Sequence, residues 1–279
     1  MITSKTKLAG LIGNPVGHSL SPAMHNAGFK HLFKQGGLDC RYFALPVAPE
    51  RLGDAIRGIS ALNFLGANIT IPYKEKALPF LDDIHEEARF IGAVNTIVND
   101  NGKLIGHNTD GRGFMKSMEE AGVSLKDKRV LMSGAGGAAR AITYYIAKEA
   151  RSLRIFDPDT PKLNALVRDL KKVNPEVHAK NSVNPSQVSD IFINATPLGL
   201  SQGDQLPIDK TFLKEGLIVC DVIYKDTPLL IEAKRLGCTT VNGLGMLFWQ
   251  GVLAFELWTH AAAPVEIMRE ALMTEYNRI

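Results

Sequence analysis

The chain has 279 residues and few cysteines, and the three that occur are scattered along it. Cys40, Cys220 and Cys238 form neither a CxxC pair nor a cluster with histidine. This pattern argues against a disulfide framework and a zinc site, and it fits the reducing conditions of the cytosol. We therefore expect a cytoplasmic protein with no bound metal ion.

Long hydrophobic runs are also missing from the sequence. The apolar run near the N-terminus is far too short for a signal sequence, and it ends in Gly and Pro. The most apolar stretch, residues 243–264, is interrupted by Gln250, Glu256 and His260. It predicts a buried amphipathic helix and gives no indication of a membrane partner.

A strong charge of either sign is absent as well. The formal net charge is +3, and the densest basic run, KDKR at residues 126–129, is short. Such a run usually forms a solvated loop, so no nucleic-acid partner is expected.

Strand-like runs alternate with helical patterns throughout the chain, which predicts an α/β protein with mostly parallel sheets. The length favours two domains, because a single core usually stops growing at about 250–300 residues. The runs are LAGLIG (8–13), RYFALPV (41–47), GANITI (66–71), AVNTIVND (93–100), RVLMSG (129–134), LRIFD (153–157), DIFINAT (190–196), LIVCDV (217–222) and TTVNG (239–243).

A domain boundary is expected between residues 100 and 128. NDNGKL predicts a hairpin turn, and residues 108–122 predict a connecting helix. Residues 244–279 are helical in pattern and carry no strand. We therefore predict one domain from residues 1–108 with 245–279, and a second domain, residues 109–244, inserted between them.

Three glycines lie between an apolar strand and an amphipathic helix in RVLMSGAGGAARAITYYIAKEA. In such a loop the first glycine makes a tight turn and the second lets the backbone approach a pyrophosphate, which the helix N-terminus then binds. A purely structural glycine turn is the alternative. The residues expected at the coenzyme are Gly134, Ala135, Gly136, Gly137 and Ala138, with Ala139 in the third, helix-packing position.

Asp157 follows the next strand, 157 − 134 = 23 residues after the first glycine. An acid about 20 residues after that glycine binds the adenosine ribose hydroxyls in NAD proteins and repels a 2′-phosphate. The alternative role is a helix cap. However, Pro161 suits the first helical position, which makes Thr160 the natural cap, with Asp159 a competitor, and leaves Asp157 spare.

Ser19 and Ser21 lie just before a helix whose first position would be Pro22. Ser21 is a good helix cap, and the alternative is that both hydroxyls bind a carboxylate. Asn68 and Thr70 alternate onto one face of a strand, where buried polar groups need partners.

Three further polar residues accompany these pairs. Lys74 is expected near the start of the helix after Pro72, with a surface lysine as the alternative. Asn95 lies within an apolar strand, and Asp110 lies in the first turn of a helix. The alternative role of Asp110 is only to satisfy the helix dipole, with Thr109 or Asn108 as the cap. Together these groups would line a pocket suited to a small polyhydroxylated ligand.

The sequence resembles the shikimate dehydrogenase family, including its quinate/shikimate branch. The matching motifs span nearly the whole chain in order: GNPVGHSLSPAMHN, GANITIPYK, GAVNTIV, HNTDGRGF, SGAGGAAR, INATPLG, CDVIYK and VNGLGMLFWQG. The resemblance implies a substrate domain built from the first half and the final helices. It also implies a Rossmann NAD(P)-binding domain between them, with the active site in the cleft.

The resemblance also implies roles for individual residues. Lys74 would be the catalytic lysine, a base toward the alcohol and an acid toward the ketone, and Asp110 would orient it. Ser19 and Ser21 would hold the substrate carboxylate, with Tyr224 near it. The groups around the ring hydroxyls would be Asn68, Thr70, Asn95 and Gln250, and those near the nucleotide or nicotinamide would be Asn194, Thr196, Gly243 and Met246.

One stretch departs from the family pattern. NADP-dependent members typically carry Asn-Arg-Thr after this strand, and this chain has Asp157-Pro158-Asp159-Thr160. We therefore expect NAD as the favoured coenzyme, although Lys162 leaves NADP as an alternative. An NAD-linked enzyme would suit oxidation of shikimate or quinate more than reduction of 3-dehydroshikimate.

The expected function is thus interconversion of shikimate and 3-dehydroshikimate by a monomer or homodimer. The alternatives are an enzyme acting mainly on quinate, an NADP-dependent biosynthetic enzyme, and a coenzyme-sensing regulatory protein without catalysis. Loss of Lys74 or Asp110 would have favoured the last, and both are present. A folate dehydrogenase is disfavoured by the SLSP and NTDG motifs.

Overall fold

A computed structural model describes residues 2–180, 182, 189–201 and 203–278. The chain forms two compact units: unit 1 comprises Met1–Thr109 and Gln250–Ile279, and unit 2 comprises Asp110–Trp249. The second boundary falls inside helix α8 (Leu244–Thr259) and not at its first residue.

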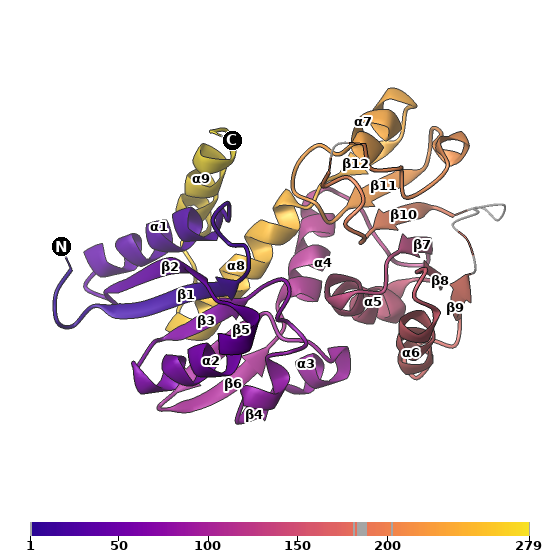
Figure 1. Ribbon diagram of the computed structural model, residues 1–279. Helices are drawn as coiled ribbons and strands as arrows, with labels where there is room; N and C mark the ends of the chain where they lie inside the picture. Colours follow the sequence, from indigo (N-terminus) through magenta and orange to yellow (C-terminus); the bar gives the residue numbers. More distant parts are fainter. Residues whose placement is uncertain (1, 181, 183–188, 202, 279) are drawn as a thin grey trace. The chain divides into compact units, whose positions relative to one another are not determined.

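Unit 1 contains a mixed six-stranded sheet of order β2-β1-β3-β5-β6-β4 (Figure 1). Strand β1 is parallel to β2 and β3, β4 is parallel to β6, and β5 is antiparallel to β3 and β6. The strands are β1 (Lys7–Gly13), β2 (Cys40–Pro46), β3 (Gly66–Ile69), β4 (Asp83–Ile84), β5 (Thr96–Asp100) and β6 (Lys103–His107).

The predicted hairpin turn joins β5 and β6. Asn101 and Gly102 both have positive φ angles, 52° and 98°, as a two-residue turn between antiparallel strands requires. The NDNGKL prediction is therefore confirmed.

The helices of unit 1 cover both faces of this sheet. Helix α1 packs against α9, as Figure 1 shows. Helix α2 packs on a cluster that contains Ile12 and Ile69, and Asn68, the neighbour of Ile69, projects from the opposite face because side chains alternate along a strand. The helices are α1 (Ser21–Lys34), α2 (Leu52–Ala61), α3 (Glu86–Ile91) and α9 (Val265–Tyr276), with the 3-10 turns η1 (Pro49–Arg51) and η2 (Leu78–Phe80).

Unit 2 contains a fully parallel six-stranded sheet of order β12-β11-β10-β7-β8-β9. This is the doubly wound order of dinucleotide-binding proteins, and the strand order reverses between β7 and β10. Ligands of such sheets bind at the carboxyl ends of the strands next to this reversal. The strands are β7 (Arg129–Ser133), β8 (Ser152–Phe156), β9 (Val177–Lys180), β10 (Ile191–Asn194), β11 (Ile218–Asp221) and β12 (Thr239–Val241).

Helices α5, α6 and α7 follow strands β7, β8 and β11 in unit 2. Helices α5 and α6 pack against β8, and α7 packs against β11 and β12 (Figure 1). A buried row of Leu131, Phe192 and Val219, aligned across β7, β10 and β11, contacts the apolar side of α7. The helices are α4 (Asp110–Glu120), α5 (Gly137–Glu149), α6 (Thr160–Leu170) and α7 (Pro228–Arg235), with the 3-10 turn η3 (Lys210–Phe212).

The predicted α/β class, with mostly parallel sheets and a Rossmann unit, is confirmed. Every strand-like run of the sequence contains a strand, and the predicted helices at residues 108–122 and 244–279 are present. Strands β4 and β9 were not predicted, because β4 has two residues and β9, VHAK, lacks a clear apolar alternation.

The helix expected after Pro72 is absent, and this prediction is wrong. Residues 71–77 form turns that lead into η2. The carbonyl of Lys74, which a helix would bond internally, instead accepts the N–H of Val94 (2.9 Å). The backbone of Lys74 is therefore held by Val94, in the segment before β5, and not within a helix.

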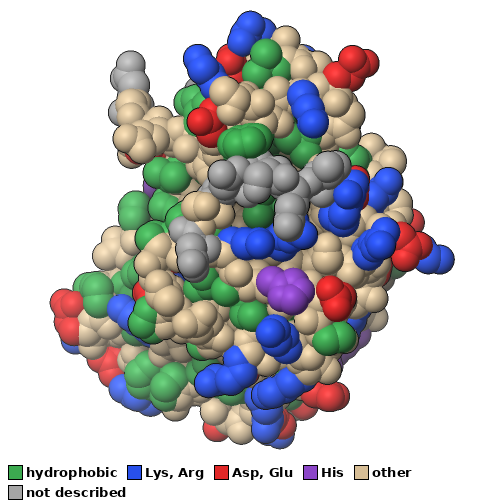
Figure 2. All heavy atoms as spheres, turned by 90° about the vertical axis from the view of Figure 1, so that its right-hand side faces the viewer, with side chains coloured by type: hydrophobic (Ala, Val, Ile, Leu, Met, Phe, Trp, Pro, Cys, Tyr) green, Lys and Arg blue, Asp and Glu red, His purple; other side chains and the backbone are tan. Residues whose placement is uncertain are grey.

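The surface shows no dominant charge on the face drawn in Figure 2. Lys and Arg side chains occur there in several separate groups, with acidic and uncharged side chains between them. Within the described residues, no helix is long and apolar enough to span a membrane.

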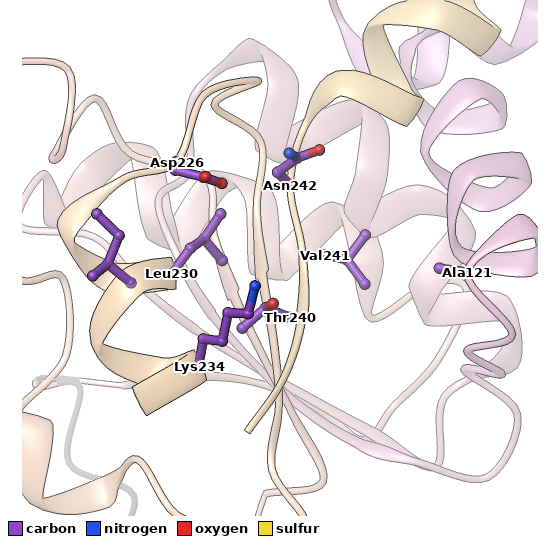
Figure 3. A pocket seen from close by; sticks show the side chains of 8 residues that line it. Ala121, Asp226, Leu230, Lys234, Thr240, Val241 and Asn242 are labelled. Carbon is purple, nitrogen blue, oxygen red and sulfur yellow. The ribbon is translucent and has the colours of Figure 1, made fainter. Parts of the chain in front are cut away.

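A pocket of about 320 Å³ lies beside α7 and β12 in unit 2 (Figure 3). It contains none of the residues that the sequence predicts at the substrate or the coenzyme. Its lining consists of Ala121, Asp226, Leu230, Ile231, Lys234, Thr240, Val241 and Asn242.

His25 of α1 is completely buried in unit 1. Its ring stacks on Tyr42, with 4.4 Å between ring centroids, and lies 5.2 Å from the Trp258 ring. Within the described residues, neither ring nitrogen has a hydrogen-bond partner. Burial lowers the pKa of His25 from 6.5 to about 3.

This burial predicts acid-dependent stability. In the unfolded chain this histidine binds a proton with a pKa of 6.5, whereas native His25 stays neutral until the pH reaches its lowered pKa of about 3. The contribution of His25 to the free energy of unfolding is therefore fully present above pH 6.5 and is lost as the pH falls toward 3. The slope reaches about 1.4 kcal/mol per pH unit. His25→Phe keeps a stacked ring without the titrating group and should remove this slope from urea-unfolding free energies, whereas His31→Phe on the same helix should retain it. Equal slopes in both variants would contradict the assignment.

Candidate functional site

The glycine loop of unit 2 begins with a backbone conformation that favours glycine. Gly134 has φ +111°, and its N–H donates to the carbonyl of Phe156 (2.7 Å). A Cβ atom at this position would lie 2.6 Å from the carbonyl oxygen of Ala195. The loop therefore passes in backbone contact with the segment after β10, at the reversal of strand order.

The loop ends in a helix N-terminus suited to an anion. Helix α5 has Gly136 as its N-cap, and no side chain caps it. The ammonium nitrogen of Lys162 lies 3.8 Å from a Cβ built at Gly136. Open helix N–H groups and a nearby cation fit the pyrophosphate of a dinucleotide, and the remaining loop residues are Ala135, Gly137 and Ala138.

Asp157 is not spare, which corrects the expectation from the sequence. One carboxylate oxygen accepts the N–H of Ala135 (2.7 Å), and the other accepts the N–H of Asp159 (2.9 Å). Asp157 therefore ties the glycine loop to the end of β8. Each oxygen retains a lone pair, so the carboxylate can still accept ribose hydroxyls.

The cap of α6 also differs from the preferred prediction. Asp159, the predicted competitor, accepts the N–H of Lys162 (3.1 Å) with its side chain. Thr160 is the first helical residue and therefore cannot be the cap. The conclusion that Asp157 does not cap this helix stands.

The segment after β10 is organised by Asn194, which is completely buried. Its amide oxygen accepts the N–H (3.1 Å) and the hydroxyl (2.6 Å) of Thr196. Its amide nitrogen donates to the carbonyl of Leu198 (3.1 Å) and to the carboxylate of Asp221 (3.1 Å). Because all four bonding positions of its amide are used within the protein, Asn194 fixes the shape of this segment.

The other predicted residues of unit 2 lie on neighbouring segments. The N–H of Gly243 donates to the carbonyl of Ile223 (2.9 Å), and a Cβ at Gly243 would clash with the carbonyl oxygen of Val222. Tyr224 follows β11 and is half-buried, and Met246 is buried in α8.

In unit 1, Asn95 and Gln250 lie together although they are 155 residues apart in the sequence. The Asn95 amide donates to the hydroxyl of Thr109 (2.9 Å) and to the side-chain oxygen of Gln250 (3.3 Å). The amide oxygen of Asn95 accepts the N–H of Thr109 (2.8 Å), and the Thr109 hydroxyl donates to the carbonyl of Gln250 (2.9 Å). Thr109, which the sequence suggested only as a helix cap, is the link between them.

Asn68 contacts this cluster from the neighbouring strand, β3. Its amide nitrogen donates to the carbonyl of Asn95 and to the hydroxyl of Thr96, both at 3.1 Å, and its oxygen accepts the hydroxyl of Tyr42 (2.8 Å). Burial raises the pKa of Tyr42, and a hydrogen bond with Ser21 partly opposes this. Asn68 is only 4% exposed. Its buried contacts connect Ser21, through Tyr42, with Asn95.

Ser19 and Ser21 lie at the start of α1. Ser21 is the first residue of α1, the N-cap position is Leu20, and no side chain caps this helix. The capping alternative for Ser21 is therefore wrong. Ser19 accepts the N–H of Ser21 with its hydroxyl oxygen (3.2 Å), which places the two hydroxyl-bearing residues on one short segment.

The remaining predicted residues divide between the units. Thr70 follows β3, and its N–H donates to the carbonyl of Ile12 (3.0 Å), while Lys74 is half-buried in the same unit. Asp110 is the first residue of α4 in unit 2 and is 4% exposed.

Sequence patterns missed Tyr42, Thr96 and Asp221, all of which bond to predicted residues. Each lies within an apolar strand run or at its end, so a buried polar side chain in such a run was the available signal.

Together, the strand order, the glycine loop and the strand-end acid define a protein with a dinucleotide-binding unit. Unit 1 carries a buried polar cluster suited to a small hydroxylated ligand. A family model described as the shikimate dehydrogenase substrate binding domain matches residues 11–97, and one described as the shikimate 5′-dehydrogenase C-terminal domain matches residues 243–273.

Whole-chain comparisons agree with these matches. The chain is 43% identical over 279 residues to the shikimate dehydrogenase (NADP+) of Carboxydothermus hydrogenoformans, covering 97% of this chain and 98% of the relative. A crystal structure of shikimate dehydrogenase in complex with NADP+ has a TM-score of 0.89 at 40% identity, covering 99% and 97% of the two chains.

A further structure, shikimate 5-dehydrogenase from Listeria monocytogenes in complex with shikimate and NAD, has a TM-score of 0.87 at 39% identity. The match covers 97% of this chain and 98% of that chain. The chain therefore belongs to the shikimate dehydrogenase family, and the resemblance seen in its motifs is confirmed.

Two glycine substitutions should separate folding from coenzyme binding. Gly134→Ala forces a side chain into a positive-φ position against Ala195 and should lower the unfolding free energy by about 1–3 kcal/mol. A Cβ in Gly136→Ala meets only the end of the Lys162 side chain, at an ordinary contact distance of 3.8 Å, so this variant should keep the melting temperature while obstructing backbone approach to the pyrophosphate. Calorimetric titration with coenzyme and thermal melts would test both, and a stable Gly134→Ala would contradict the geometry.

Proposed function

We propose that the protein transfers a hydride between a nicotinamide coenzyme and a ring hydroxyl of shikimate, interconverting shikimate and 3-dehydroshikimate. The observation that carries this proposal is the Asn95–Thr109–Gln250 cluster, which holds two amide side chains together in a chain that also has a dinucleotide loop. The names and bound ligands of its relatives supply the substrate class.

Each end of the substrate requires a different kind of group. A ring carboxylate accepts hydrogen bonds, which Ser19 and Ser21 supply from one segment, with Tyr224 as a further donor. Ring hydroxyls both donate and accept, and amides such as Asn95 and Gln250 can do the same. Thr70 adds a hydroxyl to this group, while Asn68 supports it from behind.

Oxidation of a secondary alcohol requires that a proton leave the hydroxyl and a hydride leave the carbon. The bound nicotinamide coenzyme supplies the hydride acceptor. Lys74 takes the hydroxyl proton as a neutral amine, and in the reverse direction its ammonium returns the proton to the forming alcohol. Asp110 orients the lysine in this scheme, and the protein groups that fix the ring supply much of the rate by positioning.

We propose NAD as the preferred coenzyme because of Asp157. Its carboxylate lies after β8, bonded to the glycine loop, and a 2′-phosphate brought to it would be repelled. Lys162 beside Gly136 is the group through which NADP would bind instead. The name of the Carboxydothermus relative specifies NADP+, so coenzyme choice is the property on which this chain and that relative are expected to differ.

Replacing Lys74 tests the proton-transfer role. Lys74→Ala should lower kcat for shikimate oxidation by about 10²-fold or more, within the range for general acid–base groups, while coenzyme binding and the melting temperature stay unchanged. Lys76→Ala, an exposed lysine on the same segment, is the matched control and should keep full turnover. Near-normal turnover of Lys74→Ala would remove this residue from the mechanism.

Coenzyme choice is tested by changing the acid and adding a phosphate ligand. Asp157→Asn with Pro158→Arg keeps an oxygen for the Ala135 N–H, removes the repulsion and supplies a guanidinium. The ratio of kcat/KM for NADP to that for NAD should rise by at least about tenfold. Asp159→Asn, which retains Asp157, is the control, and an unchanged ratio in the double variant would show that Asp157 does not select the coenzyme.

A further inference from the structure

A buried carboxylate joins three segments at the carboxyl ends of β10 and β11. Asp221, the last residue of β11, is only 2% exposed. One carboxylate oxygen accepts the N–H of Ile223 (3.0 Å). The other accepts the amide of Asn194 (3.1 Å) and the hydroxyl of Thr227 (2.8 Å).

The bond between Asp221 and Asn194 has a fixed direction. The oxygen of Asn194 faces the N–H of Thr196, which can only donate, and its nitrogen faces the carbonyl of Leu198, which can only accept. The amide therefore cannot flip, and it presents a donor to residue 221. An acceptor at that position is required to hold Asn194, and through it the 194–198 segment.

Asp221 holds a second segment from the other side. By accepting the N–H of Ile223 it fixes the turn after β11, and the carbonyl of Ile223 in turn accepts the N–H of Gly243 (2.9 Å). This turn also carries Tyr224. The segments bound to Asp221 thus contain several residues that the family pattern places near the coenzyme or substrate.

Burying an acid is costly, and an apolar residue would pack more cheaply at the end of an apolar strand. Burial raises the pKa of Asp221, which shows that its three donors do not fully offset the loss of water. A buried carboxylate at this position is explained if it holds its three hydrogen-bond donors in place.

We propose that Asp221 is a positioning residue for the coenzyme: it holds the 194–198 and 222–224 segments, together with Gly243, in the arrangement that receives the nicotinamide half. This rests on the proposed function for the identity of the ligand, and Asp221 itself is not a contact to it. Thr227 bonds to the same carboxylate but serves to cap α7, since its hydroxyl also accepts the N–H of Leu230 (3.4 Å).

Four variants separate positioning from simple stability. Asp221→Asn has the same shape but turns an N–H group toward at least one of the three donors. Asn194→Ala removes the residue that Asp221 holds. Thr227→Val removes the cap of α7 and leaves the Asn194 bond, and Asp209→Asn makes the same charge change at an exposed cap of η3.

The readouts are the dissociation constant for NAD by calorimetry, which needs no turnover, and the melting temperature of the ligand-free protein. Asp221→Asn and Asn194→Ala should each weaken NAD binding by about tenfold or more in fully folded protein, and the double variant should be no weaker than the poorer single one. Thr227→Val should lower the melting temperature without changing NAD affinity, and Asp209→Asn should change neither.

Wild-type NAD affinity in folded Asp221→Asn, or in Asn194→Ala where Asp221→Asn fails to fold, overturns the proposal. An equal loss of affinity in Thr227→Val also overturns it, because any destabilisation would then suffice. Wild-type protein that binds NAD but turns over no ring acid would refute the proposed substrate and leave this test of Asp221 intact. Wild-type protein that binds neither NAD nor NADP would refute both.

Discussion

Both units depend on one constraint, the need of buried polar side chains at strand ends to be hydrogen-bonded. Asn95 in unit 1 and Asn194 in unit 2 meet it in the same way, because each amide oxygen accepts the backbone N–H of a nearby threonine, Thr109 or Thr196. A backbone N–H can only donate, so each amide is locked in one orientation. The direction of each amide nitrogen is then determined, and its acceptors include Gln250 for Asn95 and Asp221 for Asn194.

This constraint divides the polar residues of the chain into two groups. Asn68 and Asn194 are almost fully buried and bonded within the protein, so they hold other residues in place. The groups proposed to bind ligands are the serines of the SLSP motif, Gln250 and the N-terminus of α5. Asp157 belongs to both groups, because its carboxylate holds the glycine loop and still has lone pairs for a ribose.

Much of this fold could be predicted from the sequence, since strand runs, the Asn-Gly turn and the glycine loop are local patterns with one structural outcome. Local patterns failed where a distant segment competed. The helix expected at Lys74 does not form because Val94 takes its carbonyl bond. The roles of Tyr42 and Asp221 were not predicted, because their partners lie on strands or loops far away in the sequence. For the candidate site, motifs predicted the residues, and the structure showed which amides, Asn68 and Asn194, are bonded within the protein.

We propose that this member of the shikimate dehydrogenase family oxidises shikimate and that Asp157 directs it to NAD. Initial rates with shikimate and with quinate, each with NAD and with NADP, test both parts at once. The highest kcat/KM is expected for shikimate with NAD. A higher kcat/KM with NADP would contradict the role given to Asp157, and turnover of quinate alone would contradict the proposed substrate.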